Sequence, residues 1–385
     1  MIYIPNKIGL YVHIPWCFKK CPYCDLNAYK MNNYFKQEIY VKKIIQDLLQ
    51  DKHFIHQRTI KSIFIGGGTP NLLHQKLLKM ILVNIKNLVS VDQNAEVTIE
   101  VHPKFVNIKN ILKYVKIGIN RISFGIQTFD KNLSQLIGRS NTTEHIISLL
   151  NQVKKIIPIN FNIDLMYGLP NQTVEDCLLD LKTAIQMNPN HISWYQMNVE
   201  KNTIFYYQKP SIPKENIILD MYKKGNRLLK QSKYKQYEIS SYAKKKYFCY
   251  HNLNYWKYGD YLGIGCGAHS KLTQKKNNII RIIKKKRIHD YYHSNNYIEK
   301  IYSVKERDQP FEYFMNIFRI LQPIKKKSFL KKTNISIPYI QKSIQTAIKK
   351  KYIIQKKKSW RILPKGKIFF NDLIELFLYQ KNNTS

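Results

Sequence analysis

The sequence Cys17-Phe-Lys-Lys-Cys21-Pro-Tyr-Cys24 places three of the chain's six cysteines within eight residues, directly after an apolar stretch at 10–14. A helix through this segment would put the three cysteines on one face. Pro22 would then lie inside the helix without an N–H and with a ring clash, so we expect a loop that follows a strand. Such a loop can turn three thiolates toward one centre. A structural zinc site usually has four ligands, whereas three thiolates can hold a [4Fe–4S] cluster and leave its fourth iron open to the amino and carboxylate groups of a small molecule.

Short segments rich in β-branched and aromatic residues alternate with amphipathic stretches over the first two thirds of the chain. The predicted strands are 10–14, 62–65, 96–100, 121–125, 160–165 and 191–196, and the predicted helices are 34–50, 72–88, 106–116, 143–156 and 173–187. This regular alternation favours an α/β fold with a parallel sheet, either barrel-like or doubly wound. In the last of these helices Thr173 and Asp176 form a capping pair, and the helical period of the apolar residues places Cys177 in the core.

Polar and small residues follow the predicted strands. The segment Gly66-Gly67-Gly68-Thr69 follows the second strand, Glu100 ends the third, Gln127 follows the fourth and Asp164 ends the fifth. Arg139 follows a short helix. Because sites in such folds lie beyond the carboxyl ends of parallel strands, we expect these residues to lie at one end of the sheet. A carboxylate there can hold ribose hydroxyls, and an arginine can pair with a carboxylate.

The spacing of the three cysteines after the first strand resembles the radical S-adenosylmethionine superfamily. The resemblance implies a partial (β/α)6 barrel with the cluster at its open end. It also implies that Cys17, Cys21 and Cys24 are the cluster ligands. The S-adenosylmethionine site would be lined by Tyr11, Tyr23, Gly67, Gly68, Thr69, Glu100, Gln127, Arg139 and Asp164.

Within the superfamily, the segments 13–17, 65–70, 162–170 and 194–196 resemble the oxygen-independent coproporphyrinogen oxidase (HemN) group. The decarboxylating oxidases of this group continue with Cys-x-Cys after the third ligand and carry a longer N-terminal segment. Here Asp25 and Leu26 follow Cys24, and only ten residues precede Tyr11. Both departures resemble the HemW branch of haem chaperones, as does the segment His251-Asn252-Leu-Asn-Tyr255-Trp256.

That last segment implies haem binding, with His251 as the ligand. A neutral imidazole is a common axial haem ligand, and Tyr and Trp offer flat apolar faces to a porphyrin. The alternative for His251 is an ordinary loop histidine that is hydrogen-bonded to the backbone. Cys249 is either a second ligand or a buried thiol, and we favour the thiol.

The sequence predicts three parts. A radical S-adenosylmethionine core barrel occupies 1–238, an aromatic and glycine-rich haem-associated segment with a basic connector occupies 239–305, and a C-terminal domain of the HemN type occupies 306–385. In the C-terminal domain we expect helices at 307–321, 337–349 and 367–379 and strands at 352–355 and 360–363. Helices followed by a two-stranded wing predict a small helical, winged-helix-like domain.

The composition excludes several classes of protein. The hydrophobic fraction of 44% is too high for a disordered chain, and no apolar run reaches the roughly 18 residues that span a bilayer. The beginning of the chain does not resemble a secretion signal, so we expect a cytoplasmic protein. The formal net charge is +39, of which +21 falls in residues 271–385. An A/T-rich genome explains this excess of lysine as well as a function does.

The primary hypothesis is a haem chaperone that binds haem and passes it to acceptor haemoproteins, and that carries one [4Fe–4S] cluster with exchangeable S-adenosylmethionine. The first alternative is an oxygen-independent coproporphyrinogen III oxidase, which decarboxylates its substrate by radical chemistry. We disfavour an enzyme, because the Cys-x-Cys extension and the long N-terminal segment are missing. The second alternative, disfavoured as well, is a nucleic-acid-binding protein that uses the basic C-terminal domain. A contact of the basic face with anionic lipid stays open.

Overall fold

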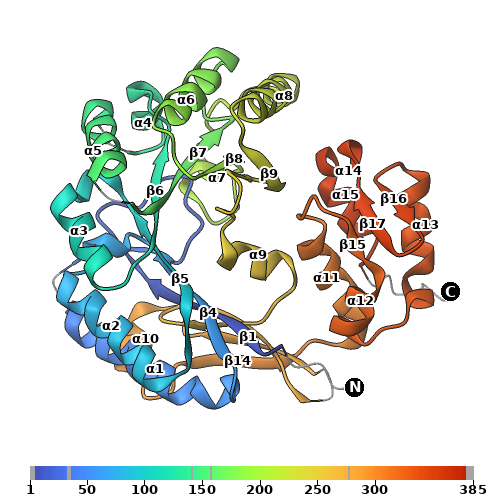
Figure 1. The fold of residues 1–385 in the computed structure, drawn as a ribbon, viewed down its shortest axis with the longest axis horizontal. Helices are drawn as coiled ribbons and strands as arrows, with labels where there is room; N and C mark the ends of the chain where they lie inside the picture. The colour runs from blue at the N-terminus through green and yellow to red at the C-terminus, as the bar shows by residue number, and fades with distance from the viewer. Residues whose placement is uncertain (1–4, 33–35, 140–141, 157, 276–277, 379–385) are drawn as a thin grey trace.

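The computed structural model describes residues 5–32, 36–139, 142–156, 158–275 and 278–378. Six parallel strands form the centre of the molecule, and they confirm the six predicted ones, five of them with longer bounds and the sixth with the same bounds. They are β1 (Lys7–Ile14), β4 (Thr59–Gly67), β5 (Val91–Val101), β6 (Arg121–Gln127), β7 (Asn160–Tyr167) and β8 (His191–Gln196). The sheet curves into a partial barrel, as Figure 1 shows.

Helices cover the outer face of the curved sheet (Figure 1). They are α1 (Gln37–Ile55), α2 (Gln75–Leu88), α3 (Ile108–Lys116), α4 (Lys131–Leu136), α5 (Thr143–Ile156), α6 (Val174–Gln186) and α8 (Glu215–Gln231). The short helix α7 (Ile204–Gln208) lies instead beside the cysteine loop, where the Phe205 N–H donates to the Pro22 carbonyl at 3.0 Å. The predicted helices match α1, α2, α3, α5 and α6, although residues 34 and 35 lie outside the described residues. Thr173 and Asp176 form the predicted capping box of α6, and Cys177 is buried in the core.

Alternate residues of each strand face opposite sides of the sheet. In β6 the apolar Ile122, Phe124 and Ile126 belong to the hydrophobic core. The residues between them are Arg121, Ser123, Gly125 and Gln127, so they face the interior of the barrel. The interior of the barrel is therefore lined by polar side chains. Such a lining is suited to binding a ligand, whereas a hydrophobic core would be lined by apolar side chains.

Both edges of the sheet carry further strands, which the sequence did not predict. Next to β1 lies β11 (Tyr261–Ile264), which is parallel to it, and then the antiparallel strands β12 (His269–Thr273), β13 (Ile279–Lys284) and β14 (Ile298–Ser303). Next to β8 lie β10 (Ser241–Ala243) and β9 (Lys235–Glu238). The whole sheet has twelve strands. Leu262, Ile282 and Tyr291 belong to the core of the barrel, although the sequence analysis treats their segment as separate from it.

The C-terminal part has its own hydrophobic core. It contains α11 (Gln309–Ile317), α12 (Lys326–Thr333), α13 (Gln341–Lys349), α14 (Pro364–Ile368) and α15 (Phe370–Glu375), with a small sheet of β15 (Ile324–Lys325), β17 (Ser359–Ile362) and β16 (Ile353–Lys356). The helices and the wing agree with the winged-helix-like prediction. The sequence did not predict α12, and the helix predicted at 367–379 is divided between α14 and α15; its last residue lies outside the described ones.

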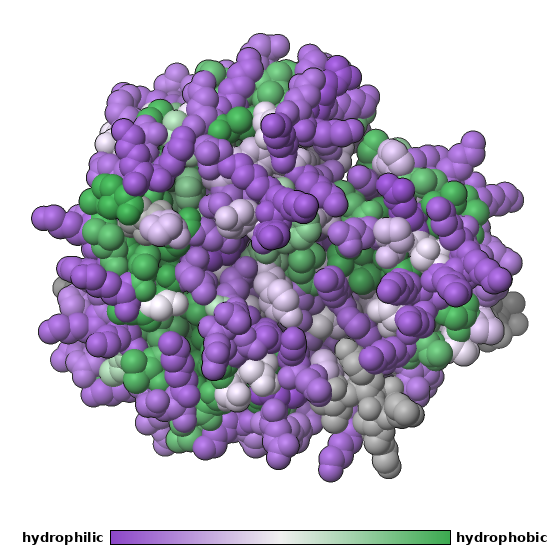
Figure 2. Space-filling view, viewed as in Figure 1, coloured by the Kyte–Doolittle hydropathy of each residue, from purple (hydrophilic) through white to green (hydrophobic). Residues whose placement is uncertain are grey.

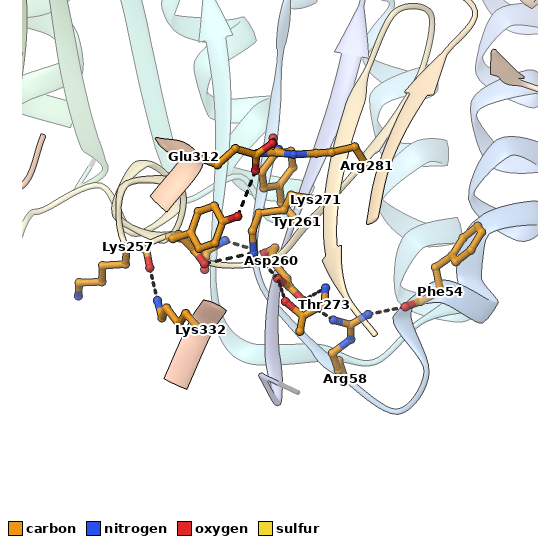
Figure 3. A network of polar contacts seen from close by, with 12 residues as sticks. Phe54, Arg58, Lys257, Asp260, Tyr261, Lys271, Thr273, Arg281, Glu312 and Lys332 are labelled. Carbon is orange, nitrogen blue, oxygen red and sulfur yellow. Dashed lines mark hydrogen bonds and ion pairs between the residues drawn. The ribbon is translucent and has the colours of Figure 1, made fainter. Parts of the chain in front are cut away.

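The helix α9 (Tyr250–Trp256) lies inside the curve of the sheet, between the barrel and the C-terminal part (Figure 1). The residues after α9 are held by Asp260, whose carboxylate forms ion pairs with Arg58 at 2.7 Å and Lys271 at 2.9 Å. The backbone and side chain of Thr273 also donate to it (Figure 3). All four side chains are buried, so the network fixes the end of the α9 segment against α1 and the β11–β12 edge.

Two short strands, β2 (Trp16–Cys17) and β3 (Tyr29–Lys30), flank the cysteine loop, and α10 (Ile288–His293) packs near α1.

Hydrophilic side chains cover most of the face viewed in Figure 2. Within the described ranges, every helix is too short or too polar to cross a lipid bilayer.

Candidate functional site at the open end of the barrel

Cys17 is the last residue of β2, and Cys21 and Cys24 lie in the loop between β2 and β3, so the segment is not a helix, as predicted. Cys17 is buried, while Cys21 and Cys24 are half-buried, and all three are free thiols. The Cys24 N–H donates to the Cys21 carbonyl at 3.1 Å, which makes a turn between the two. Burial raises the pKa of Cys24 to about 11, and the neighbouring Cys17 and Cys21 add to this increase. The three sulfurs are therefore close enough to interact electrostatically.

The three thiols do not converge fully. Nowhere in the described part of the chain do three or more His, Cys, Asp or Glu side chains form an arrangement that could hold a metal ion. The chemistry of the donor set nevertheless fits a cluster with an open iron, because three free thiols lie in one loop and have no disulfide partner. Their role as ligands stays a prediction.

The glycine segment at the end of β4 passes directly under this loop. The Gly68 N–H donates to the Ile14 carbonyl at 2.7 Å, and the Thr69 N–H donates to the Trp16 carbonyl at 2.6 Å. A Cβ on Gly68 would lie 2.5 Å from the Trp16 carbonyl oxygen, so no larger residue fits there. Gly67 adopts a φ of +109°, a conformation that favours glycine. These contacts place the glycine segment beside the cysteine loop.

Two acidic side chains face the barrel interior from β5 and β7, the strands on either side of β6. Glu100 accepts from the Gly67 N–H at 3.1 Å, and burial together with the nearby Asp164 raises the pKa of Glu100 to about 8. Asp164 accepts from Asn162 Nδ2 at 2.7 Å and from Ser123 Oγ at 2.9 Å. Burial also raises the pKa of Asp164. Carboxyl groups in this setting can accept from the hydroxyls or the ammonium of a bound small molecule.

The remaining predicted residues surround the same opening. Arg139 is buried, and its Nε lacks a hydrogen-bond partner in the described part of the chain. Burial raises the pKa of Tyr23, and the nearby Arg139 charge opposes this. Gln127 has a φ of +74° and accepts from the Tyr195 hydroxyl at 2.8 Å. The Tyr11 hydroxyl lies 3.0 Å from His13 Nδ1. This end of the barrel therefore offers carboxyl, amide and guanidinium groups within reach of one another.

His251 lies elsewhere, on α9 and against the first half of β4. It is 2% exposed. Its Nδ1 lies 2.8 Å from Ser62 Oγ, and its ring stacks on Phe64 with 5.0 Å between centroids. Its Nε2 is buried and has no hydrogen-bond partner in the described ranges. The His251 ring does not bond to the backbone as the alternative expected, because its hydrogen-bond partner in the described part of the chain is the Ser62 side chain. Haem ligation by His251 stays a prediction.

Cys249 precedes α9 and is fully buried, and burial raises its pKa to about 12. Its Sγ lies 3.5 Å from Glu96 Oε1. Both oxygens of Glu96 also accept from the backbone, from Tyr250 N and His251 N at 2.9 Å each. A buried, protonated thiol beside a carboxylate agrees with the interpretation of Cys249 as a buried thiol.

Several interior residues were not singled out from the sequence. They alternate with core residues on the same strands as the predicted site and are His13, Ser62, Thr98, Arg121, Asn162, His191 and Tyr195. The alternation of side chains in each strand could have identified them, because every second residue before Glu100 or Asp164 faces the same side of the sheet as these two carboxyl groups.

Comparisons with known proteins agree with this geometry. The family model described as "Radical SAM superfamily" matches residues 11–183. The protein named "Heme chaperone HemW" from Buchnera aphidicola (subsp. Acyrthosiphon pisum, strain APS) is 47% identical over 96% of this chain and 98% of its own length. The protein of the same name from Escherichia coli K12 is 38% identical over 98% of this chain and its full length.

A solved structure of coproporphyrinogen III oxidase (HemN) from Escherichia coli, described as a radical SAM enzyme, superimposes with a TM-score of 0.82. It covers 96% of this chain and 90% of its own, at 22% sequence identity. At that identity the similarity shows the fold: a partial barrel followed by a small C-terminal domain.

Proposed function

The chain belongs to the HemW family of the radical S-adenosylmethionine superfamily, and on this basis we propose that it binds haem and transfers it to acceptor haemoproteins. Its resident cofactors would be one [4Fe–4S] cluster and exchangeable S-adenosylmethionine, as the superfamily implies. The observation that carries the haem assignment is the unpartnered Nε2 of His251.

The cofactor site follows from the open end of the barrel. Cys17, Cys21 and Cys24 would hold the cluster and leave one iron open, and the glycine segment would let the backbone approach S-adenosylmethionine. Glu100 and Asp164 would accept hydrogen bonds from its ammonium and ribose groups, and Arg139 would pair with its carboxylate. When bound, the reduced cluster supplies one electron.

The state of the His251 ring supports a haem ligand. Burial, and then the nearby Arg121 charge, lower the pKa of His251 to about 3, so the ring is neutral at pH 7. A proton on Nδ1 that is donated to Ser62 Oγ leaves the lone pair of Nε2 free, which is the form that ligates iron. An unpartnered buried nitrogen otherwise only costs free energy.

Haem can reach Nε2 only if α9 changes its position, because the ring is buried. The helix has seven residues, and His251 is the one residue of α9 that is fully buried. Tyr250 on the same helix is 45% exposed. We propose that α9 moves when haem binds, and this motion would have to break the hydrogen bonds of Glu96 to the backbone of Tyr250 and His251.

A haem titration of the anaerobically reconstituted protein tests this proposal. We expect a shifted Soret band that saturates near one haem per chain, and a loss of that shift in His251→Ala. His53→Ala is the matched control, because His53 lies on the outer helix α1 and hydrogen-bonds only to its own backbone turn. An unchanged titration in His251→Ala would reject this ligand.

The same preparation tests the alternative enzyme. It would be supplied with coproporphyrinogen III, S-adenosylmethionine and a reductant. We expect no decarboxylated product. Formation of protoporphyrinogen together with 5′-deoxyadenosine would contradict the chaperone proposal.

A further inference from the structure

The interior of the barrel contains a second group of polar atoms, below the predicted cofactor site. Thr98 Oγ1, Arg121 Nε, Asn160 Oδ1 and His251 Nε2 are all buried, and none has a hydrogen-bond partner among the described residues. Thr98 pairs with Arg121 in the ladder between β5 and β6, and Arg121 pairs with Asn160 between β6 and β7. Three of the four therefore lie side by side on adjacent strands.

Arg121 is the unusual member of this group. Its side chain is 2% exposed, and its Nε–H has no hydrogen-bond partner in the described part of the chain. A buried donor without a partner is unfavourable, so natural proteins nearly always pair it. The Nε–H of Arg121 is therefore available to an acceptor on a bound molecule.

The neighbouring carboxylates are already engaged by other donors. Both oxygens of Glu96 accept backbone N–H groups at the start of α9. Both oxygens of Asp164 accept from Asn162 and Ser123. The charges of these carboxylates lie close enough to act on Arg121, but none of the hydrogen bonds that they accept comes from its Nε–H. The Nε–H therefore remains available.

The two histidines beside Arg121 add no positive charge. Burial, and then the Arg121 charge, lower the pKa of both His191 and His251, so both rings are neutral at pH 7. His191 is fully bonded, through Nδ1 to Asn162 Oδ1 at 2.6 Å and through Nε2 to the Tyr237 hydroxyl at 2.7 Å. The positive charge facing this part of the interior therefore comes from Arg121.

The group lies deeper in the barrel than the predicted S-adenosylmethionine site, although the Arg121 charge also acts on Glu100 and Asp164 of that site. Arg121 is the first residue of β6, and Gln127 is its last. Six residues of extended strand correspond to about 20 Å. A molecule that enters at the cysteine loop would have to extend down the barrel to reach Arg121.

We propose that Arg121 anchors a carboxylate-binding site inside the barrel, with the Thr98 hydroxyl as a second donor. The planar guanidinium fork matches the two oxygens of a carboxylate. Haem brings two such groups in its propionates, and that source rests on the proposed function. A small free carboxylate is the other source of the same chemistry.

The first test compares haem with haem dimethyl ester, whose propionates carry no charge. We expect the wild-type protein to bind haem about tenfold to a hundredfold more tightly than the ester, the range for a charged hydrogen bond. In Arg121→Gln this preference should disappear. Arg227→Gln is the matched control, because it removes the same charge from the exposed face of α8, and it should keep the preference.

The second test uses the haem-free protein and sodium propionate. If a free carboxylate is the ligand, propionate raises the melting temperature of the wild type but not of Arg121→Gln, measured against sodium chloride at equal ionic strength.

These outcomes separate the two proposals. A wild-type protein that binds no haem refutes the proposed function, while the propionate test still decides the site at Arg121. A wild type that prefers neither haem to its ester nor propionate to chloride overturns the carboxylate site.

Discussion

His251 Nδ1 and Ser62 Oγ lie 2.8 Å apart, across 189 residues of sequence. This contact joins α9 to β4, and it turns the opposite nitrogen of the ring toward the interior of the barrel. The partner of one ring nitrogen determines whether the other carries a proton. Ser62 is therefore the residue that positions the His251 ring.

Replacing Ser62 by Ala should weaken haem binding about tenfold, which is the lower end of the usual effect of losing the hydrogen bond behind a metal-ligating histidine. The measurement is a Soret titration of the anaerobically reconstituted variant. Ser148→Ala serves as the control, because Ser148 is exposed on the outer helix α5. If Ser62→Ala binds haem as the wild type does, the contact does not position the ligand.

Replacing Cys17, Cys21 or Cys24 by Ala should each abolish stable cluster assembly, because two thiolates cannot retain a cluster that three hold. Iron and acid-labile sulfide per chain after anaerobic reconstitution give the readout. The control is Cys177→Ala, which removes a thiol buried in the core and should retain the iron. Wild-type iron content in any of the three variants would exclude that cysteine as a ligand.

Replacing Asp260 by Asn should lower the free energy of unfolding by about 3–5 kcal/mol, the cost of leaving buried partners unpaired. Asp260 pairs with both Arg58 and Lys271, and all three side chains are at most 3% exposed. Urea unfolding monitored by circular dichroism measures the change. Asp290→Asn on the surface should leave the unfolding curve unchanged. An Asp260→Asn curve that matches the wild type would show that the network does not stabilise the fold.

The stability of the cofactor-free protein should fall between pH 5 and pH 8, in part through Glu100. The pKa of Glu100 is raised from 4.5 to about 8 in the folded state. Between these values the folded state binds more protons than the unfolded state, so rising pH favours unfolding. Glu100→Gln has no such proton to lose, and its stability should fall less over this range, by a few kcal/mol.

Urea unfolding at several pH values measures this slope. Some pH dependence should remain in Glu100→Gln, because the buried Asp47 and Asp180 have pKa values raised to about 6 and about 7. The exposed Glu175→Gln is the control and should keep the wild-type slope. Equal slopes in the wild type and Glu100→Gln would contradict the assignment.

Local patterns in the sequence were sufficient to predict the six parallel strands and the main helices. Alternation and helical period are properties of short windows, and Pro22 alone excluded a helix through the cysteine segment. The strand-end residues followed from the same patterns, since parallel strands end at one edge. The edge strands β11–β14 were missed because they are short and join the sheet beside β1, far from them in the chain.

The sequence by itself determined the class of the fold and the end of the barrel that holds the cysteine loop, because both depend on neighbouring residues. Only the tertiary structure decided that α9 lies inside the curve of the sheet and that the His251 ring contacts Ser62. It also decided that Arg121 Nε has no hydrogen-bond acceptor among the described residues. These relationships join segments that are tens to hundreds of residues apart, as in the pairing of Arg58 with Asp260. A local sequence period cannot predict such pairs, because they join segments that are distant in the sequence. The partners are the polar groups that become buried together when the chain folds and that must then bond to one another.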